Sequence, residues 1–168
     1  MNNLISVHTA RFFALIAFQV LILNNVNFFG FINPYVYIMF IALFPVRNNR
    51  LTIISLSFLL GLSVDLFLDT GGIHAAACVF AAYVRPIILK FCFGTIYEHQ
   101  NIKFETVEFD SKLIYYSLLT AVHHFVLFSL ETFNISKIIF ILKKTLFSSI
   151  FTIILCVLVT IIFSRKKK

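Results

Sequence analysis

The chain has 168 residues, of which 60% are hydrophobic and 12% are charged, and its formal net charge is +7. Soluble domains are about 45–50% apolar and about 25% charged, so this composition, with a mean hydropathy of +0.96, excludes a soluble globule. It indicates one small all-α integral membrane domain. No basic patch with interleaved aromatic residues is present, which argues against nucleic-acid binding.

Six segments are apolar enough to be membrane helices, since a helix needs about 20 residues to cross the hydrocarbon core. In chain order they cover residues 9–24, 34–45, 51–68, 73–93, 112–131 and 136–163. The second segment is the shortest of the six. Pro45 stops a helix that begins at Pro34, and only about 18 Å of helix fits between the two prolines. Whether it crosses stays open, and five crossings would put the chain ends on opposite sides.

Basic residues decide the orientation of these helices. With the N-terminus inside, Lys and Arg gather at the cytoplasmic face and only Lys137 lies in an outer loop. The tail 165–168 then attracts anionic lipid on the cytoplasmic side. We expect the first helix to stay as an uncleaved anchor. With no Trp, an aromatic belt has to come from the six Tyr residues.

The main soluble segment is the cytoplasmic loop 94–111. Within it, residues 102–109 alternate between apolar and polar side chains, which is the period of a short strand or hairpin arm. A plain loop fits the segment better than a docking site.

Ionisable residues in the membrane segments are the candidates for function, because they are costly in a bilayer and are usually retained for a partner or ligand. Topology places most of them in the outer half of the membrane, where opposite charges would neutralise one another. We expect Asp65 and Lys144 to form an ion pair that holds the fold or lines a cavity. The candidate residues of this cluster or interface are Asp65, His74, Arg85, Glu131, Lys143 and Lys144.

Small and polar residues recur at helical spacing in the same segments. Ser57, Gly61 and Asp65 lie four residues apart, which allows a neighbouring helix to approach closely. We interpret Ser57, Gly61 and the hydroxyls of the last helix as packing seams. A second polar row runs along the last helix and comprises Lys144, Ser148, Thr152, Cys156 and Thr160.

The histidines and cysteines give no clear metal site. His74 beside Asp65 or Asp69 suits a helix-end hydrogen bond better than a cation site. His123 and His124 point about 100° apart on a helix, so we expect one to face the bundle and the other the lipid. The three cysteines lie in apolar runs without metal-ligand spacing. Since no catalytic motif is present, we expect neither enzymatic activity nor a cofactor or metal.

Several short motifs, spread from about Arg11 to Lys144, resemble the rod shape-determining protein MreD family. The most specific part is Gly61-Leu62-Ser63-Val64-Asp65-Leu66-Phe67 followed by Gly72-Ile73-His74-Ala75-Ala76-Ala77. The other matching stretches are 19–24, 32–35 and Arg85-Pro86. Asp65, His74 and Arg85 match characteristic residues of the family.

The resemblance implies a non-enzymatic component of the bacterial cell-elongation complex in the inner membrane, needed for rod shape and lateral peptidoglycan synthesis. Its implied partners are MreC, other membrane proteins of that complex, membrane lipids and, indirectly, MreB. It also implies six transmembrane helices in a fold similar to the substrate-binding subunits of energy-coupling factor transporters.

Two functions follow from these observations. A scaffold that binds MreC should have a packed core with Asp65 paired to a neighbouring group. A subunit that binds a small solute or lipid intermediate should instead have an outer cavity, roughly several hundred cubic ångströms in volume, lined by Asp65, His74 and Lys144.

Overall fold

The computed structural model describes residues 2–26, 30, 32–46, 49–94 and 107–164, and these residues form helices and irregular segments without a strand element. Four of the helical stretches are long and apolar enough to cross a membrane. They are α3 (Arg50–Leu68), α4 (Ile73–Phe93), α6 (Phe109–Thr132) and the continuous stretch Ile135–Thr160, which contains η2 (Ile135–Lys137) and most of α7 (Ile138–Ser164). The expectation of an all-helical fold is therefore confirmed over the described residues, and four of the six predicted membrane segments are long and apolar enough to span a bilayer.

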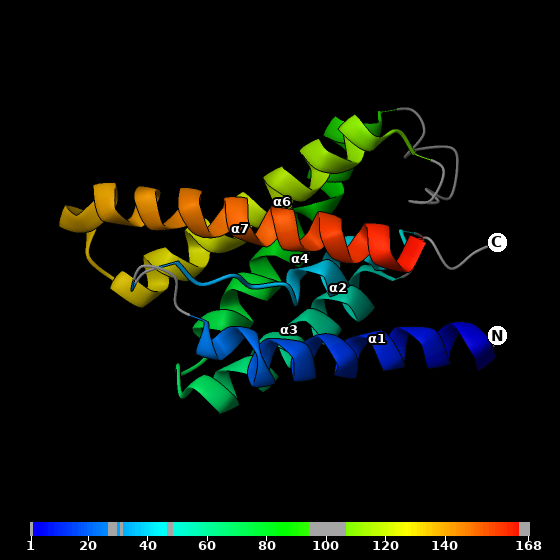
Figure 1. Cartoon of the computed structure of the whole chain (residues 1–168), viewed down its shortest axis with the longest axis horizontal. Coiled ribbons are helices and arrows are strands. Elements are labelled where there is room, and N and C mark those ends of the chain that lie inside the picture. The colour runs from blue at the N-terminus through cyan, green and yellow to red at the C-terminus, as the bar shows by residue number, and fades with distance from the viewer. Residues whose placement is uncertain (1, 27–29, 31, 47–48, 95–106, 165–168) are drawn as a thin grey trace.

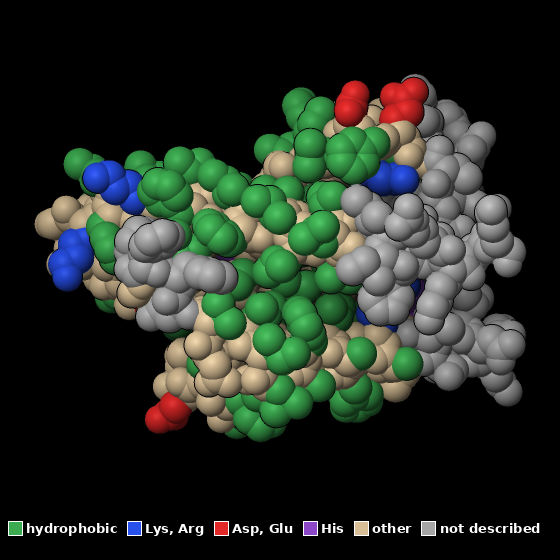
Figure 2. Space-filling model, viewed as in Figure 1, with side chains coloured by type: hydrophobic (Ala, Val, Ile, Leu, Met, Phe, Trp, Pro, Cys, Tyr) green, Lys and Arg blue, Asp and Glu red, His purple; other side chains and the backbone are tan. Residues whose placement is uncertain are grey.

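These four helices pack in chain order, α3 against α4, α4 against α6 and α6 against α7. The first helix, α1 (Asn2–Leu21), continues into the short η1 (Leu23–Asn25) and contacts α3. In Figure 1, α1 begins and α7 ends at the same end of the bundle. The face drawn in Figure 2 is largely hydrophobic, and its charged side chains lie towards the two ends, as expected for a lipid-facing surface.

The second predicted helix, over residues 34–45, is reduced to α2 (Ile38–Leu43). Six residues span only about 9 Å, too little to cross a bilayer as a helix. The preceding residues 32–37 are not helical, although they are mostly buried. We call residues 32–43 the broken segment. Irregular backbone is tolerated at membrane depth only where protein or water bonds its polar groups.

Side chains from two other helices supply those bonds. Gln19 of α1 donates from Nε2 to the carbonyl of Pro34 (3.2 Å) and accepts from the backbone N–H of Val36 at Oε1 (3.0 Å). On α7, Ser148 accepts from the N–H of Asn33 (3.3 Å), and Thr152 accepts from the N–H of Tyr35 (3.1 Å). The broken segment is thus held between α1 and α7.

The remaining boundaries differ little from the sequence-based predictions. Segments 51–68 and 73–93 coincide with α3 and α4, whereas α1 begins at Asn2 rather than near residue 9. The fifth and sixth helices begin up to three residues earlier than expected, at Phe109 and, through η2, at Ile135. Residues 95–106, with most of the predicted strand arm, and the tail 165–168 lie outside the described residues.

Candidate functional site

Asp65, in the last turn of α3, caps the beginning of α4. Its carboxylate accepts hydrogen bonds from the backbone N–H groups of His74 (3.0 Å) and Ala75 (2.8 Å) and from the hydroxyl of Thr70 (2.5 Å). The first N–H groups of a helix have no partner within the helix, and they carry the positive end of its dipole. The expected helix-end hydrogen bond is therefore present, and the carboxylate that makes it is that of Asp65.

Gly61 lets the two helices approach closely enough for this cap. A Cβ atom at Gly61 would lie 2.5 Å from both the Cα atom of Ala75 and the carbonyl oxygen of His74. Both are backbone atoms, which cannot move aside as a flexible side chain could. Ser57 and Gly61 are both buried, so they form a packing seam as expected.

Four buried side chains connect α4, the broken segment and α6. The hydroxyl of Tyr37 lies 2.8 Å from Nδ1 of His74 and 3.1 Å from Nε2 of His123. The Sγ atom of Cys78 lies 3.8 Å from the same Nε2. Because one hydroxyl carries one proton, it can donate to only one of the two rings.

His124 makes a second connection, to α7. Its Nδ1 lies 2.8 Å from the carbonyl oxygen of Thr120, which can only accept, so Nδ1 carries the proton. Nε2 is then an acceptor, and the hydroxyl of Thr152 donates to it at 3.2 Å while accepting from the N–H of Tyr35. The expectation that one of the two adjacent histidines faces lipid is wrong, since both are fully buried. The broken segment bonds His123 directly, through the Tyr37 hydroxyl, and reaches His124 only through Thr152.

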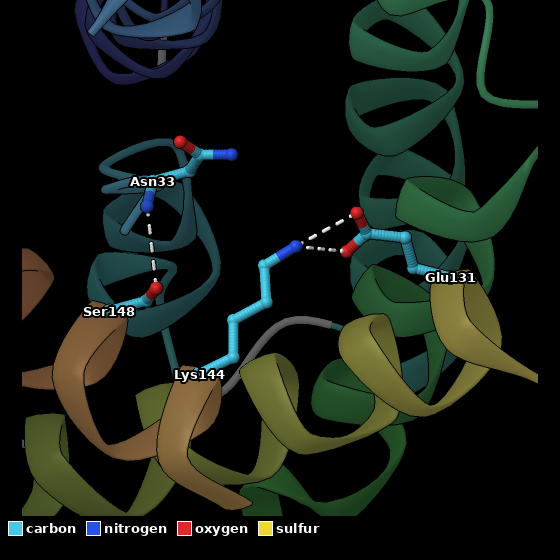
Figure 3. A network of polar contacts seen from close by, with 4 residues as sticks. All are labelled: Asn33, Glu131, Lys144 and Ser148. Atoms are coloured by element: carbon cyan, nitrogen blue, oxygen red, sulfur yellow. Dashed lines mark hydrogen bonds and ion pairs between the residues drawn. The ribbon is translucent and has the colours of Figure 1, made fainter. Parts of the chain in front are cut away.

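The expected ion pair between Asp65 and Lys144 does not form. Lys144 instead holds Glu131 of α6, with Nζ 2.8 Å from each carboxylate oxygen, and lies 4.6 Å above the centre of the Phe128 ring. Figure 3 shows this pair beside the contact of Ser148 with Asn33. The oxygens of Asp65 are already occupied by the beginning of α4.

The other two candidates lie apart from this ion pair. Lys143 is exposed. Arg85 follows His74 by eleven residues on α4, which corresponds to about 17 Å along the helix. Its guanidinium donates to the Tyr115 hydroxyl (2.9 Å) and to the carbonyl oxygens of Ala42 (3.3 Å) and Phe44. Arg85 therefore stabilises the C-terminal end of α2, where the helix dipole is negative.

Sequence reasoning missed three fully buried residues that complete these contacts. Gln19 interrupts an apolar run in the first helix, a signal that could have identified it. Tyr37 and Tyr115 gave no signal, because a tyrosine in a membrane segment suits an interface belt equally well. The Tyr115 hydroxyl also donates to the carbonyl of Ala42 (3.0 Å), beside Arg85.

Two further features bear on ligand binding, the grouping of possible metal ligands and a groove on the helix surface. Among the described residues, no three His, Cys, Asp or Glu side chains are grouped so that they could hold a metal ion. The three cysteines are free thiols. An open groove of about 430 Å³ is present on α3 and α4, but the residues that line it are nearly all apolar: Ile54, Ser55, Phe58, Leu59 and Val79.

Comparisons of this chain with protein-family models, with curated proteins and with solved structures found no match.

Proposed function

We propose that this chain is a non-enzymatic scaffold of the bacterial cell-elongation complex, of the MreD type. One observation carries the proposal: the residues on which the resemblance depends serve contacts between segments of the chain. Gly61 and Asp65 join α3 to α4, His74 contacts the broken segment through Tyr37, and Arg85 holds the end of α2. Residues used in this way stiffen a protein, as a scaffold requires.

The state of the ionisable groups favours a scaffold over a subunit that binds solutes. Asp65 is 4% exposed and its carboxylate already has three donors, and Lys144 has Glu131 as its counterion. A ligand at these groups would have to displace contacts within the protein. The groove on α3 and α4 contains none of these groups.

In this proposal the chain lies in the inner membrane with both termini in the cytoplasm, and α1 and the broken segment complete six membrane-embedded segments. The meeting of the α1 start and the α7 end at one end of the bundle supports termini on the same side (Figure 1). The proposed partners are MreC and other elongation-complex membrane proteins, with MreB reached indirectly. The proposed fold is similar to that of the transporter substrate-binding subunits.

Co-purification with MreC from the same cell tests the proposal. The full chain is solubilised in mild detergent and captured as wild type, Asp65→Ala and Asp69→Asn. The last is a matched control, because Asp69 is exposed and has a left-handed backbone (φ 53°) that Asn also adopts. We expect wild type and Asp69→Asn to retain MreC and Asp65→Ala to lose it. No association of wild type with well-behaved MreC would refute the scaffold and favour the binding subunit.

A further inference from the structure

A cation lies about one helical turn before Ile54, the first residue that lines the groove on α3 and α4. Arg50, the first residue of α3, donates from Nη2 to the carbonyl of Tyr83 (3.2 Å), and its guanidinium carbon lies 4.6 Å above the centre of the Tyr83 ring. Ile54 and Phe58 follow Arg50 at intervals of four residues, and Val79 precedes Tyr83 by four. Helical spacing therefore places the cation and the groove on one face of the helix pair.

Towards the other end of the groove, the helix contact described above lies two residues beyond Leu59 on α3. At Gly61 the backbones of α3 and α4 touch, as its short distances to Ala75 show, and the groove lies on the Arg50 side of this contact. The result is an apolar trough between two apolar spans. Near one end the two helix backbones touch, and near the other an arginine is stacked on an aromatic ring.

Arg50 has capacity for an anion. A guanidinium has five N–H donors, and the contact with Tyr83 uses only part of them. Among the described residues the structure gives Arg50 no carboxylate partner. Arg50 is exposed at the end of a membrane-spanning helix, where the phosphates of a bilayer lie.

We propose that this site binds an anionic phospholipid, with its phosphate at Arg50 and one acyl chain along the groove. The inference is independent of the proposed scaffold function. A lipid suits the site better than a partner's transmembrane helix for two reasons. Helices pack closely where small residues line the contact, whereas Phe58 and Leu59 line this groove. A flexible acyl chain follows a shallow apolar groove. The lipid also supplies a negative charge for Arg50, which has no carboxylate partner among the described residues.

Tryptophan fluorescence tests this directly, because the chain has no Trp. Phe58→Trp places a single reporter in the groove, and Phe125→Trp places one on α6 at similar exposure (42% against 46%). Each full-length variant is reconstituted into vesicles that contain dibrominated phosphatidylglycerol or dibrominated phosphatidylcholine, and quenching by the two lipids is compared. We expect the anionic lipid to be preferred about fivefold at position 58, as for one cation near an anionic surface, and not at position 125.

Substitutions at Arg50 separate charge from structure. Arg50→Gln in the Phe58→Trp background should abolish the preference, whereas Arg50→Lys should keep most of it and shows that the protein still folds. Added salt should weaken the preference. Equal quenching by both lipids at position 58, or a preference that survives in Arg50→Gln, would overturn the proposal. Weak quenching by both lipids at position 58 would also overturn it, because protein would then cover the groove.

Discussion

Replacing Asp65 by Ala should loosen the junction of α3 and α4 more than any change at the neighbouring Asp69. The substitution leaves the backbone N–H groups of His74 and Ala75 without their acceptor, and lipid chains offer no hydrogen bond in its place. At about 1–2 kcal/mol for each buried group, unfolding should become easier by about 2–4 kcal/mol. Thermal unfolding of the purified protein in detergent should then show a Tm lower by about 5–10 °C, at a few degrees per kcal/mol.

Two control variants make this prediction specific. Asp65→Asn keeps one carbonyl oxygen as an acceptor but loses the charge that favours a helix beginning, so its Tm should lie between those of wild type and Asp65→Ala. Asp69→Asn should have the Tm of wild type, since Asp69 is exposed and Asn adopts its backbone conformation. If Asp65→Ala melts with wild type, or if both positions tolerate Ala equally in a cell-shape complementation assay, the cap is not what holds the helices together.

Three further changes test the other contacts, each by Tm in detergent. Gly61→Ala should destabilise the protein by about 1–3 kcal/mol, because the new Cβ atom would meet backbone atoms of α4. Ser63→Ala on the same helix should leave the Tm unchanged, and equal Tm values for the two variants would contradict the close approach. Tyr37→Phe removes the hydroxyl shared by two histidines and should cost about 1–3 kcal/mol, a loss that an unchanged Tm would disprove. Glu131→Gln leaves Lys144 without its counterion and should cost about 1 kcal/mol, since Glu131 is 43% exposed; an equal Tm in Glu131→Gln and wild type would show that the pair contributes nothing.

The junction of α3 and α4 was the most predictable part of the molecule from sequence. The two helices are consecutive, and the intervening turn contains Gly71 and Gly72, both with positive φ, so the partners are local in the chain. The depth argument for Lys144 was weaker, because Asp65 and Glu131 both carry negative charge near the same end of the bundle. Depth does not tell how a helix is rotated about its axis. The rotation of α7 about its axis places Lys144 beside Glu131 rather than beside Asp65.

The broken segment could not be predicted from its own residues. Its apolar sequence around Ile38–Leu43 suits a longer helix, and Pro34 is a favourable first residue. The non-helical backbone depends on side chains of other helices, chiefly Gln19, Ser148 and Thr152. These side chains make hydrogen bonds that a helix would make within its own backbone. A polar residue in an apolar helix indicates that some partner exists, but it does not say that the partner is unwound backbone.

The positions of Asp65 and Arg85 bear on whether the polar residues could serve a ligand. The carboxylate of Asp65 contacts the beginning of α4, where the helix dipole is positive, and the guanidinium of Arg85 contacts the end of α2, where it is negative. Each charge is therefore offset by backbone dipoles within the protein. A ligand that took the oxygens of Asp65 would uncap α4 beside its closest contact with α3, so binding there would oppose the packing that forms the site. Buried charges of this kind suit a protein whose function requires a fixed shape in the membrane, which is why we favour the scaffold.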